Sequence, residues 1–221
     1  MAGVAIAGII LAAYLLGSIP TGYLIAKWVK GIDIRQHGSG GTGATNVLRN
    51  VGKSAAITVL VVDLLKGALA VLLVRSVYPA LMTSLPGLNP LWQPWLEAIA
   101  GLMALLGHSR SIWLNFTGGK SAASGLGILL ALSWPVGLGT LGVFAGVVAA
   151  SRIVSLGSIS AAIATILLMA ILQQPIPYIG LAIAGGLYVI LRHRSNIERL
   201  LAGTEPRLGS QKAAETYTDS P

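Results

Sequence analysis

Residues 38–46, GSGGTGATN, contain glycines in a spacing that is typical of phosphate-binding loops. Gly38, Gly40 and Gly43 match the G-x-G-x-x-G fingerprint of dinucleotide-binding folds, and Asp63 stands twenty residues after Gly43, where such folds keep a ribose-binding acid. That fingerprint requires a buried strand directly before its first glycine. Here residues 30–37 are polar and charged, and Asp63 belongs to an apolar run that continues to residue 78. The sequence therefore disfavours a nicotinamide site.

The same glycines keep a physical use without a nucleotide fold. Backbone that lacks Cβ atoms lets successive N–H groups converge on an anion. Arg49 adds a planar guanidinium group suited to phosphate. Neutral donors are available from Ser39, Thr42, Thr45 and Asn46. An anion-binding loop and an ordinary flexible loop are both consistent with these residues.

A second glycine-rich segment, residues 107–127, reads GHSRSIWLNFTGGKSAASGLG. Its GGKS run suggests a Walker A loop, but that motif requires a glycine where Leu114 stands. Gly118, Gly119 and Lys120 still form a turn suited to phosphate, with exposed N–H groups, a point cation and a following helix N-terminus. Lys120 by itself is also consistent with a charge that sets membrane topology.

A third polar segment, residues 192–205, reads RHRSNIERLLAGTE. His193 and Asn196 are three residues apart and would share one face of a helix. His193 and Glu198 resemble the H-x-x-x-x-D box of soluble-headed glycerolipid acyltransferases, but the acid is Glu and no soluble domain surrounds it. We treat that match as chance, and His193 is equally consistent with a histidine at the membrane interface.

Other polar residues lie within or beside apolar stretches. Asp63 and Lys66 stand three residues apart, and charges at membrane depth usually pair, so we expect a structural ion pair near the site. Ser155 and Ser158 lie near one end of a stretch, where helix serines commonly serve packing. His108 could act as a base, as a hydrogen-bond donor or as an interfacial residue.

The composition of the 221-residue chain is that of a membrane protein. Hydrophobic residues make up 54% and charged residues 10%, with a mean hydropathy of +0.78, whereas soluble domains carry about 25% charged residues. The chain has no cysteine, which excludes disulfides, thiolate metal sites and a cysteine nucleophile. The net charge of +8 is scattered and indicates membrane topology, with no nucleic-acid partner expected.

Seven apolar stretches predict helices. They cover residues 4–28, 55–78, 91–106, 125–133, 136–150, 153–172 and 176–191. The first exceeds the roughly 20 residues that a bilayer requires, and Gly17 and Pro20 are expected to bend it. The fourth and fifth are short, but short helices can span when they extend into flanking residues or the bilayer thins. The predicted fold is all-α, a polytopic membrane protein with seven transmembrane helices.

The basic residues support this count. With seven spans, one side of the membrane receives Lys27, Lys30, Arg35, Arg49, Lys53, Arg110, Lys120, Arg152, Arg192, Arg194, Arg199, Arg207 and Lys212. Five or six spans would divide them between the two sides. The positive-inside rule then places the N-terminus outside and the C-terminus in the cytoplasm.

Taken together, GSGGTGATNVLR, GHSRSIWLNFTGGKSAASGLG and RHRSNIERLLAGTE, in this order, resemble the motifs of the PlsY family of integral-membrane glycerol-3-phosphate acyltransferases. The resemblance extends from residue 16 to residue 205. It implies transfer of an acyl group from acyl phosphate to the sn-1 hydroxyl of glycerol 3-phosphate, which releases phosphate and begins phospholipid synthesis. It also implies that neither acyl-CoA nor acyl-carrier protein is the donor, and that no metal or other cofactor is needed. The family's seven-helix, N-out topology agrees with the charge distribution.

The resemblance implies two catalytic residues, His193 and Asn196. The substrate-binding residues that it implies are Ser39, Gly40, Gly43, Thr45, Asn46, Arg49, His108, Gly118, Gly119, Lys120 and Ser158. Among them, Ser39, Arg49 and Lys120 resemble the family's contacts to glycerol phosphate and phosphate. The chain departs from the family pattern at Gly41-Thr42, where Asn-Pro is usual, and at residues 121–124, where Gly-Val-Ala-Thr is usual.

We therefore expect one transmembrane acyltransferase domain at residues 1–208 and a polar, disordered tail at residues 209–221. The expected partners are the two substrates and the lipid bilayer, with no obligate protein partner and with the active site on the cytoplasmic side of the cell membrane. From the residues alone, a phosphate or organic-anion transporter is the main rival. Transporters, however, tend to place their sites at the bilayer midplane, often in inverted repeats, and we find no repeat. A non-catalytic lipid head-group binder is a second rival.

Overall fold

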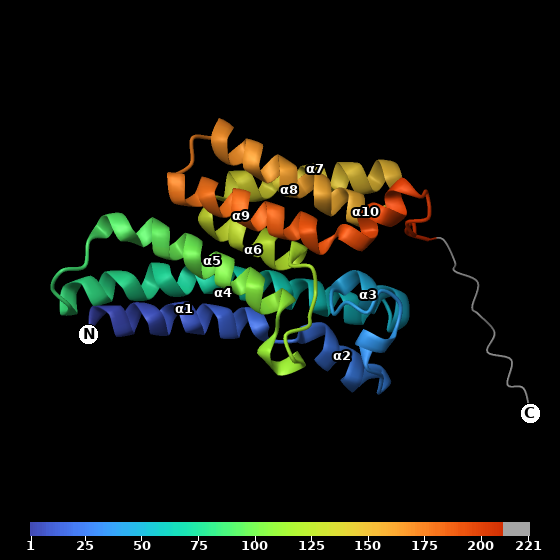
Figure 1. Cartoon of the computed structure of the whole chain (residues 1–221), viewed down its shortest axis with the longest axis horizontal. Helices are drawn as coiled ribbons and strands as arrows, with labels where there is room; N and C mark the ends of the chain where they lie inside the picture. Colours follow the sequence, from blue (N-terminus) through green and yellow to red (C-terminus); the bar gives the residue numbers. More distant parts are fainter. Residues whose placement is uncertain (210–221) are drawn as a thin grey trace, which may run out of the picture.

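The computed structural model describes residues 1–209, and this part of the chain forms ten α-helices without a β-strand (Figure 1). The all-α prediction is therefore confirmed. The predicted tail lies outside the described residues except for Gly209. The helices are α1 (Ala2–Ser18), α2 (Thr21–Lys30), α3 (Ala44–Asn50), α4 (Lys53–Ser84), α5 (Gln93–Ser109), α6 (Ala122–Leu132), α7 (Trp134–Ser151), α8 (Val154–Ile171), α9 (Ile176–Arg192) and α10 (Arg194–Leu201).

Each of the seven predicted apolar stretches contains a helix. The first stretch is interrupted between α1 and α2, at Ile19 and Pro20, because proline lacks the N–H that would continue the helical ladder. Within residues 1–209, four helical segments are long and apolar enough to cross a membrane, or five if α9 and α10, bent by 60°, count as one. The helix α6 has only 11 residues. Seven spans and an outside N-terminus therefore remain predictions.

The helices are arranged so that the polar segments lie at one end of the bundle. The long helix α4 packs against α1, α5 and α6, while α8 packs against both α7 and α9. The short helices α2, α3 and α10 lie at the end away from the N-terminus, on the right in Figure 1. Large apolar side chains are exposed on the outer surface of the bundle, including Leu60, Leu65, Leu69 and Leu72 of α4. Such a surface suits a lipid environment.

The helices α4 and α6 cross with their backbones in contact. A Cβ atom on Gly127 would lie 1.9 Å from the carbonyl oxygen of Leu64, and one on Gly67 would lie 2.1 Å from that of Ser124. Small residues at a crossing let membrane helices approach closely. These two glycines thus bring α6 against α4, which sets the position of the segment that carries Lys120.

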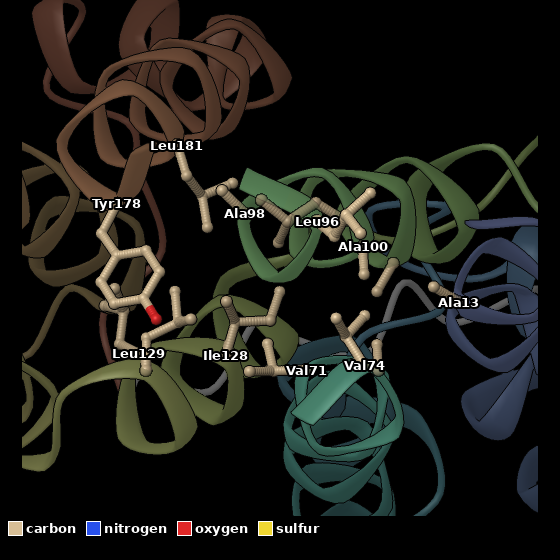
Figure 2. Packing of buried hydrophobic residues seen from close by; sticks show 14 of the residues in the cluster. Ala13, Val71, Val74, Leu96, Ala98, Ala100, Ile128, Leu129, Tyr178 and Leu181 are labelled. Carbon is tan, nitrogen blue, oxygen red and sulfur yellow. The ribbon is translucent and has the colours of Figure 1, made fainter. Parts of the chain in front are cut away.

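The end of the bundle that contains the N-terminus is closed by apolar packing and one polar cluster. Figure 2 shows Val71 of α4 beside Ile128 of α6, and Val74 of α4 pointing toward Ala100 of α5. In the polar cluster, buried Glu97 of α5 pairs with Arg75 of α4 at 2.8 Å and accepts a hydrogen bond from Tyr178 of α9 at 2.6 Å. Arg75 also donates to the Ala131 carbonyl at 2.7 Å. These contacts tie α4, α5, α6 and α9 together.

Candidate active site

A cavity of about 490 Å³ lies between the polar segments and the interior of the bundle. Its apolar part is lined by side chains of α4, α5, α6, α7, α8 and α9. The polar side chains that line it are Ser39, Thr45, Asn46, Arg49, Asp63, His108, Lys120, Ser121, Thr140, Ser155, Ser158, Thr165, His193, Asn196, Arg199 and Glu205. Three segments that are far apart in the sequence therefore meet at one site.

The first loop is held in shape by Asn46. Its Nδ2 donates to the carbonyls of His37 at 3.0 Å and Gly41 at 2.9 Å, and its Oδ1 accepts from the Ser39 N–H at 3.1 Å. A side-chain amide has two donors and one acceptor oxygen, so these bonds use both ends of the group. Although Asn46 lines the cavity, its contacts point to a role in holding the loop.

Arg49 lies in the last turn of α3 and also lines the cavity. Its guanidinium group is exposed and donates to the Pro206 carbonyl at 3.4 Å, near the outer limit for a hydrogen bond. This contact brings the first polar segment beside the third.

The second segment places a cation next to a glycine and a histidine. Lys120 is half-buried and donates from Nζ to Asn196 Oδ1. Burial lowers the pKa of Lys120, and the nearby guanidinium groups of Arg199, Arg192 and Arg49 lower it further, against an opposing effect of Glu205. An anion that binds here would relieve the repulsion among these cations. The site is therefore electrostatically suited to phosphate.

Gly119 is required by its close approach to His108. A Cβ atom on Gly119 would lie 2.1 Å from His108 Nε2. A larger residue at 119 would displace either the imidazole ring or the backbone that leads to Lys120.

Asp63 and Lys66 form the ion pair that the sequence predicts. Lys66 Nζ lies 2.8 Å from Asp63 Oδ1, and both side chains are buried. Lys66 Nζ also donates to the Ile19 carbonyl at 2.9 Å, at the break between α1 and α2. On the other side, His108 Nδ1 lies 3.6 Å from Asp63 Oδ1. The pair thus connects the helix break to His108 and, through its ring, to Gly119.

One departure from the family pattern, Ser121, has a local explanation. Its φ of 65° lies in the left-handed region that favours glycine. The Ser121 hydroxyl donates to the Leu105 carbonyl at 2.8 Å and lies 2.6 Å from Ser109 Oγ. These hydrogen bonds offset the backbone cost of a side chain at this position and hold the residue that follows Lys120.

The third segment positions His193 at the bend between α9 and α10. The ring is buried, and Nδ1 lies 2.7 Å from the Val189 carbonyl. Because a carbonyl can only accept, Nδ1 must carry the proton in this contact. Nε2 is then the nitrogen that can meet a substrate, since His193 lines the cavity.

Asn196 and Glu205 form a buried network beside His193. Asn196 accepts from Lys120 through Oδ1 and donates from Nδ2 to Glu205 Oε1 at 2.6 Å. Glu205 also accepts from Ser155 Oγ at 2.7 Å and from Arg199 Nε at 2.7 Å. Burial disfavours the Glu205 carboxylate, but these hydrogen bonds outweigh burial, so its pKa lies below the usual value. Glu205 thus fixes which end of the Asn196 amide faces Lys120.

The structure gathers most of the predicted site residues. All of them line the cavity except Gly40 and Gly118, and Gly118 packs instead against the His108 carbonyl, 2.3 Å from where its Cβ would be. Ser158 lines the cavity while its hydroxyl donates back to the Val154 carbonyl at 3.0 Å. Glu198 pairs at 3.1 Å with Arg194 on an exposed surface, which agrees with treating the match of His193 and Glu198 to the acyltransferase box as chance.

Sequence reasoning missed Ser155, Arg199 and Glu205 as members of the site. Arg199 lies three residues after Asn196, a spacing that signals a shared helix face. Glu205 ends the third polar segment, and only the fold brings it to Ser155, fifty residues earlier.

Glu205→Gln is expected to lower kcat/KM by about 10- to 100-fold. Glutamine cannot accept hydrogen bonds at both ends, and a hydrogen bond to a charged group contributes about 1.5–3 kcal/mol. The loss should appear mainly in KM, because Glu205 acts on the cavity through Asn196 and Lys120. Glu198→Gln, at an exposed acid of the same segment, is the matched control and should be unchanged. If Glu205→Gln and Glu198→Gln have the same kcat/KM, Glu205 does not contribute to the site.

Comparison with known proteins identifies the family. A family model described as "Glycerol-3-phosphate acyltransferase" matches residues 7–203. A curated protein of that name from Nostoc sp. is 62% identical over 214 residues, with 94% of each chain covered. The protein of the same name from Trichormus variabilis is 60% identical over 214 residues, again with 94% of each chain covered.

Solved structures give the same result. A crystal structure of PlsY, an integral membrane glycerol 3-phosphate acyltransferase, in its glycerol 3-phosphate form superposes with a TM-score of 0.81 at 38% identity, covering 93% of this chain and 96% of that one. The lysophosphatidic acid form of PlsY gives a TM-score of 0.79 with the same identity and coverage.

Proposed function

The chain belongs to the PlsY family of integral-membrane glycerol-3-phosphate acyltransferases, and we propose that it transfers the acyl group of acyl phosphate to the sn-1 hydroxyl of glycerol 3-phosphate. The products are 1-acylglycerol 3-phosphate and inorganic phosphate. The observation that carries the proposal is a single cavity with cationic side chains in its polar part and a wall of apolar side chains beyond them. That cavity suits a substrate with a phosphate head and a fatty chain.

Two phosphate groups must be held at once in this reaction. Arg49 of α3 and Lys120 before α6 come from different segments and line the same cavity. Arg199 of α10 adds a third cation, which Glu205 holds at 2.7 Å. A guanidinium group can donate two parallel hydrogen bonds to two phosphate oxygens, whereas an ammonium group acts as a point charge.

In the proposed step, the sn-1 hydroxyl oxygen attacks the acyl carbonyl carbon. The new ester bond forms as the bond from that carbon to the phosphate oxygen breaks, and phosphate leaves with the electron pair. An acyl phosphate is an activated mixed anhydride whose leaving group needs little assistance. Positioning and electrostatic stabilisation by Lys120 and its neighbours can then supply much of the rate.

The hydroxyl proton has two possible acceptors, His193 and the phosphate of the donor. His193 is held through Nδ1 by Val189, and Asn196 is held between Lys120 and Glu205. Groups fixed in this way are suited to orient the hydroxyl of the acceptor. We favour transfer of the proton to the donor phosphate, as the family resemblance implies, with His193 and Asn196 orienting glycerol 3-phosphate.

His193→Gln is expected to reduce kcat by less than about 10²-fold, because general-base help is typically worth about 10²–10⁴ and glutamine keeps a hydrogen-bonding group that can orient the acceptor. The measurement is single-turnover release of phosphate at saturating substrates. A loss of kcat of about 10²–10⁴-fold would contradict transfer of the proton to the donor phosphate and would make His193 the base. Tyr188→Phe is the control. It removes a hydroxyl from another residue of α9 that does not line the cavity, and it should leave kcat unchanged.

The same proposal includes the topology. Seven spans place the basic loops and the cavity on the cytoplasmic side of the cell membrane, as the distribution of Lys and Arg favours. The cavity is consistent with this orientation, since Arg49, Lys120 and Arg199 of those basic segments line it.

The reaction is tested with purified protein in lipid, palmitoyl phosphate and glycerol 3-phosphate. We expect release of phosphate and formation of lysophosphatidate that depend on both substrates. Parallel reactions with palmitoyl-CoA, or without the acceptor, should give neither product. Turnover with acyl-CoA and none with acyl phosphate would overturn the proposed donor while leaving the family assignment intact.

A further inference from the structure

On α7 and α8, the cavity lining ends at two polar side chains. On α8, residues Ser155, Ser158, Ala162 and Thr165 all line the cavity, and their spacing of three to four residues places them on one helix face. From Ser158 to Thr165 this face runs about 10 Å along the helix axis. The cavity lining on α7 ends at Thr140, which faces Thr165.

The two threonine hydroxyls are satisfied by each other and by the backbone. Thr165 Oγ1 donates to the Ala161 carbonyl at 2.9 Å. Thr140 Oγ1 lies 3.0 Å from Thr165 Oγ1 and is therefore the donor of that bond, since the Thr165 proton is already used. Both residues are buried. The pair fastens α7 to α8 and has no hydroxyl proton left for a ligand.

The bundle is packed beyond the pair. One helical turn further, Val136 of α7 and Met169 of α8 are fully buried in the apolar core, and neither lines the cavity. A chain that enters from the polar end therefore meets a wall at Thr140 and Thr165.

We propose that the Thr140–Thr165 pair is the end wall of the acyl-chain site and sets the longest chain that the enzyme accepts. The inference rests on the proposed acyl transfer. A methylene that cannot be buried forfeits about fourfold in affinity, the factor that corresponds to its transfer free energy. Once the acyl chain is long enough to reach the wall, kcat/KM should therefore fall progressively with each further methylene.

The test compares the wild type with Thr140→Ala, Thr165→Ala, Thr165→Val and Thr165→Leu. For each variant, kcat/KM is measured for saturated acyl phosphates from octanoyl to eicosanoyl. The alanine variants remove wall atoms and should extend the profile to longer chains by about fourfold per methylene newly buried. Thr165→Leu should shorten the profile and keep octanoyl turnover, which also shows that it folds. Thr165→Val keeps the wall volume without the hydroxyl and should leave the profile in place.

Two outcomes would contradict the proposal that Thr140 and Thr165 form the end wall. One is an alanine profile that superposes on the wild type, and the other is a valine profile that shifts as far as the alanine one. Thermal stabilisation by lysophosphatidates of the same chain lengths provides a second readout that needs no acyl donor. If the wild type turns over only with another acyl donor, the proposed donor is wrong, and the same series in that donor and in lysophosphatidate still decides the position of the wall.

Discussion

Lys120→Ala is expected to reduce kcat/KM by about 10²–10³-fold, the range seen when one preorganised group that stabilises transition-state charge is removed. Lys120 lines the cavity, is half-buried and contacts Asn196, so its charge acts where water screens it weakly. In the proposed reaction, charge develops on the phosphate of the acyl donor as the carbon–oxygen bond breaks. A cation at this place stabilises that change directly.

Two further variants are compared with Lys120→Ala. Lys53→Ala, at an exposed lysine that begins α4 and does not line the cavity, is the control for loss of one positive charge and should keep full activity. Lys120→Arg should recover only part of the rate, because a planar guanidinium does not fit a site shaped for a compact ammonium group. Wild-type kcat/KM in Lys120→Ala would show that the bound phosphate is held by other residues.

Gly127→Ala is expected to destabilise the protein by about 3 kcal/mol, the upper end of the usual cost of overpacking. The added Cβ would lie 1.9 Å from the Leu64 carbonyl oxygen and 3.1 Å from the backbone nitrogen of Ala68. Backbone atoms cannot move aside as a flexible side chain does, so α6 must shift away from α4. Since Lys120 is separated from α6 only by its N-cap residue, Ser121, activity should fall together with stability.

Gly142→Ala is the matched control for this change. Gly142 lies within α7 and is exposed, and a Cβ there would meet no atom within 4 Å. The replacement should be neutral or stabilise the helix by up to about 1 kcal/mol. Thermal unfolding in detergent, followed by loss of helical circular dichroism, compares the two. Equal melting temperatures for Gly127→Ala and wild type would show that the α4–α6 crossing is not tightly packed.

Much of the fold follows from local properties of the sequence. Apolar stretches of sufficient length predict helices wherever they occur. Pro20 predicts a bend in the first one, and the structure shows a break there, because a missing N–H acts within a single turn. The number of spans does not follow in the same way. The helix α6 has 11 residues, and its place in the bundle depends on the Gly127 and Gly67 contacts with α4.

The candidate site also has features that the sequence predicts and features that only the tertiary structure shows. The residue types and spacing of the glycine-rich loops, Arg49, Lys120 and His193 predict anion-binding chemistry, because each motif is a short run of adjacent residues. Only the tertiary structure decided that Asn46 holds its own loop and that Glu205 bonds to Ser155 and to Asn196. It also decided where the cavity ends, at Thr140 and Thr165, residues that no motif connects. Such pairings depend on which helix faces meet in the packed bundle, and that is a property of the whole chain and not of any one segment.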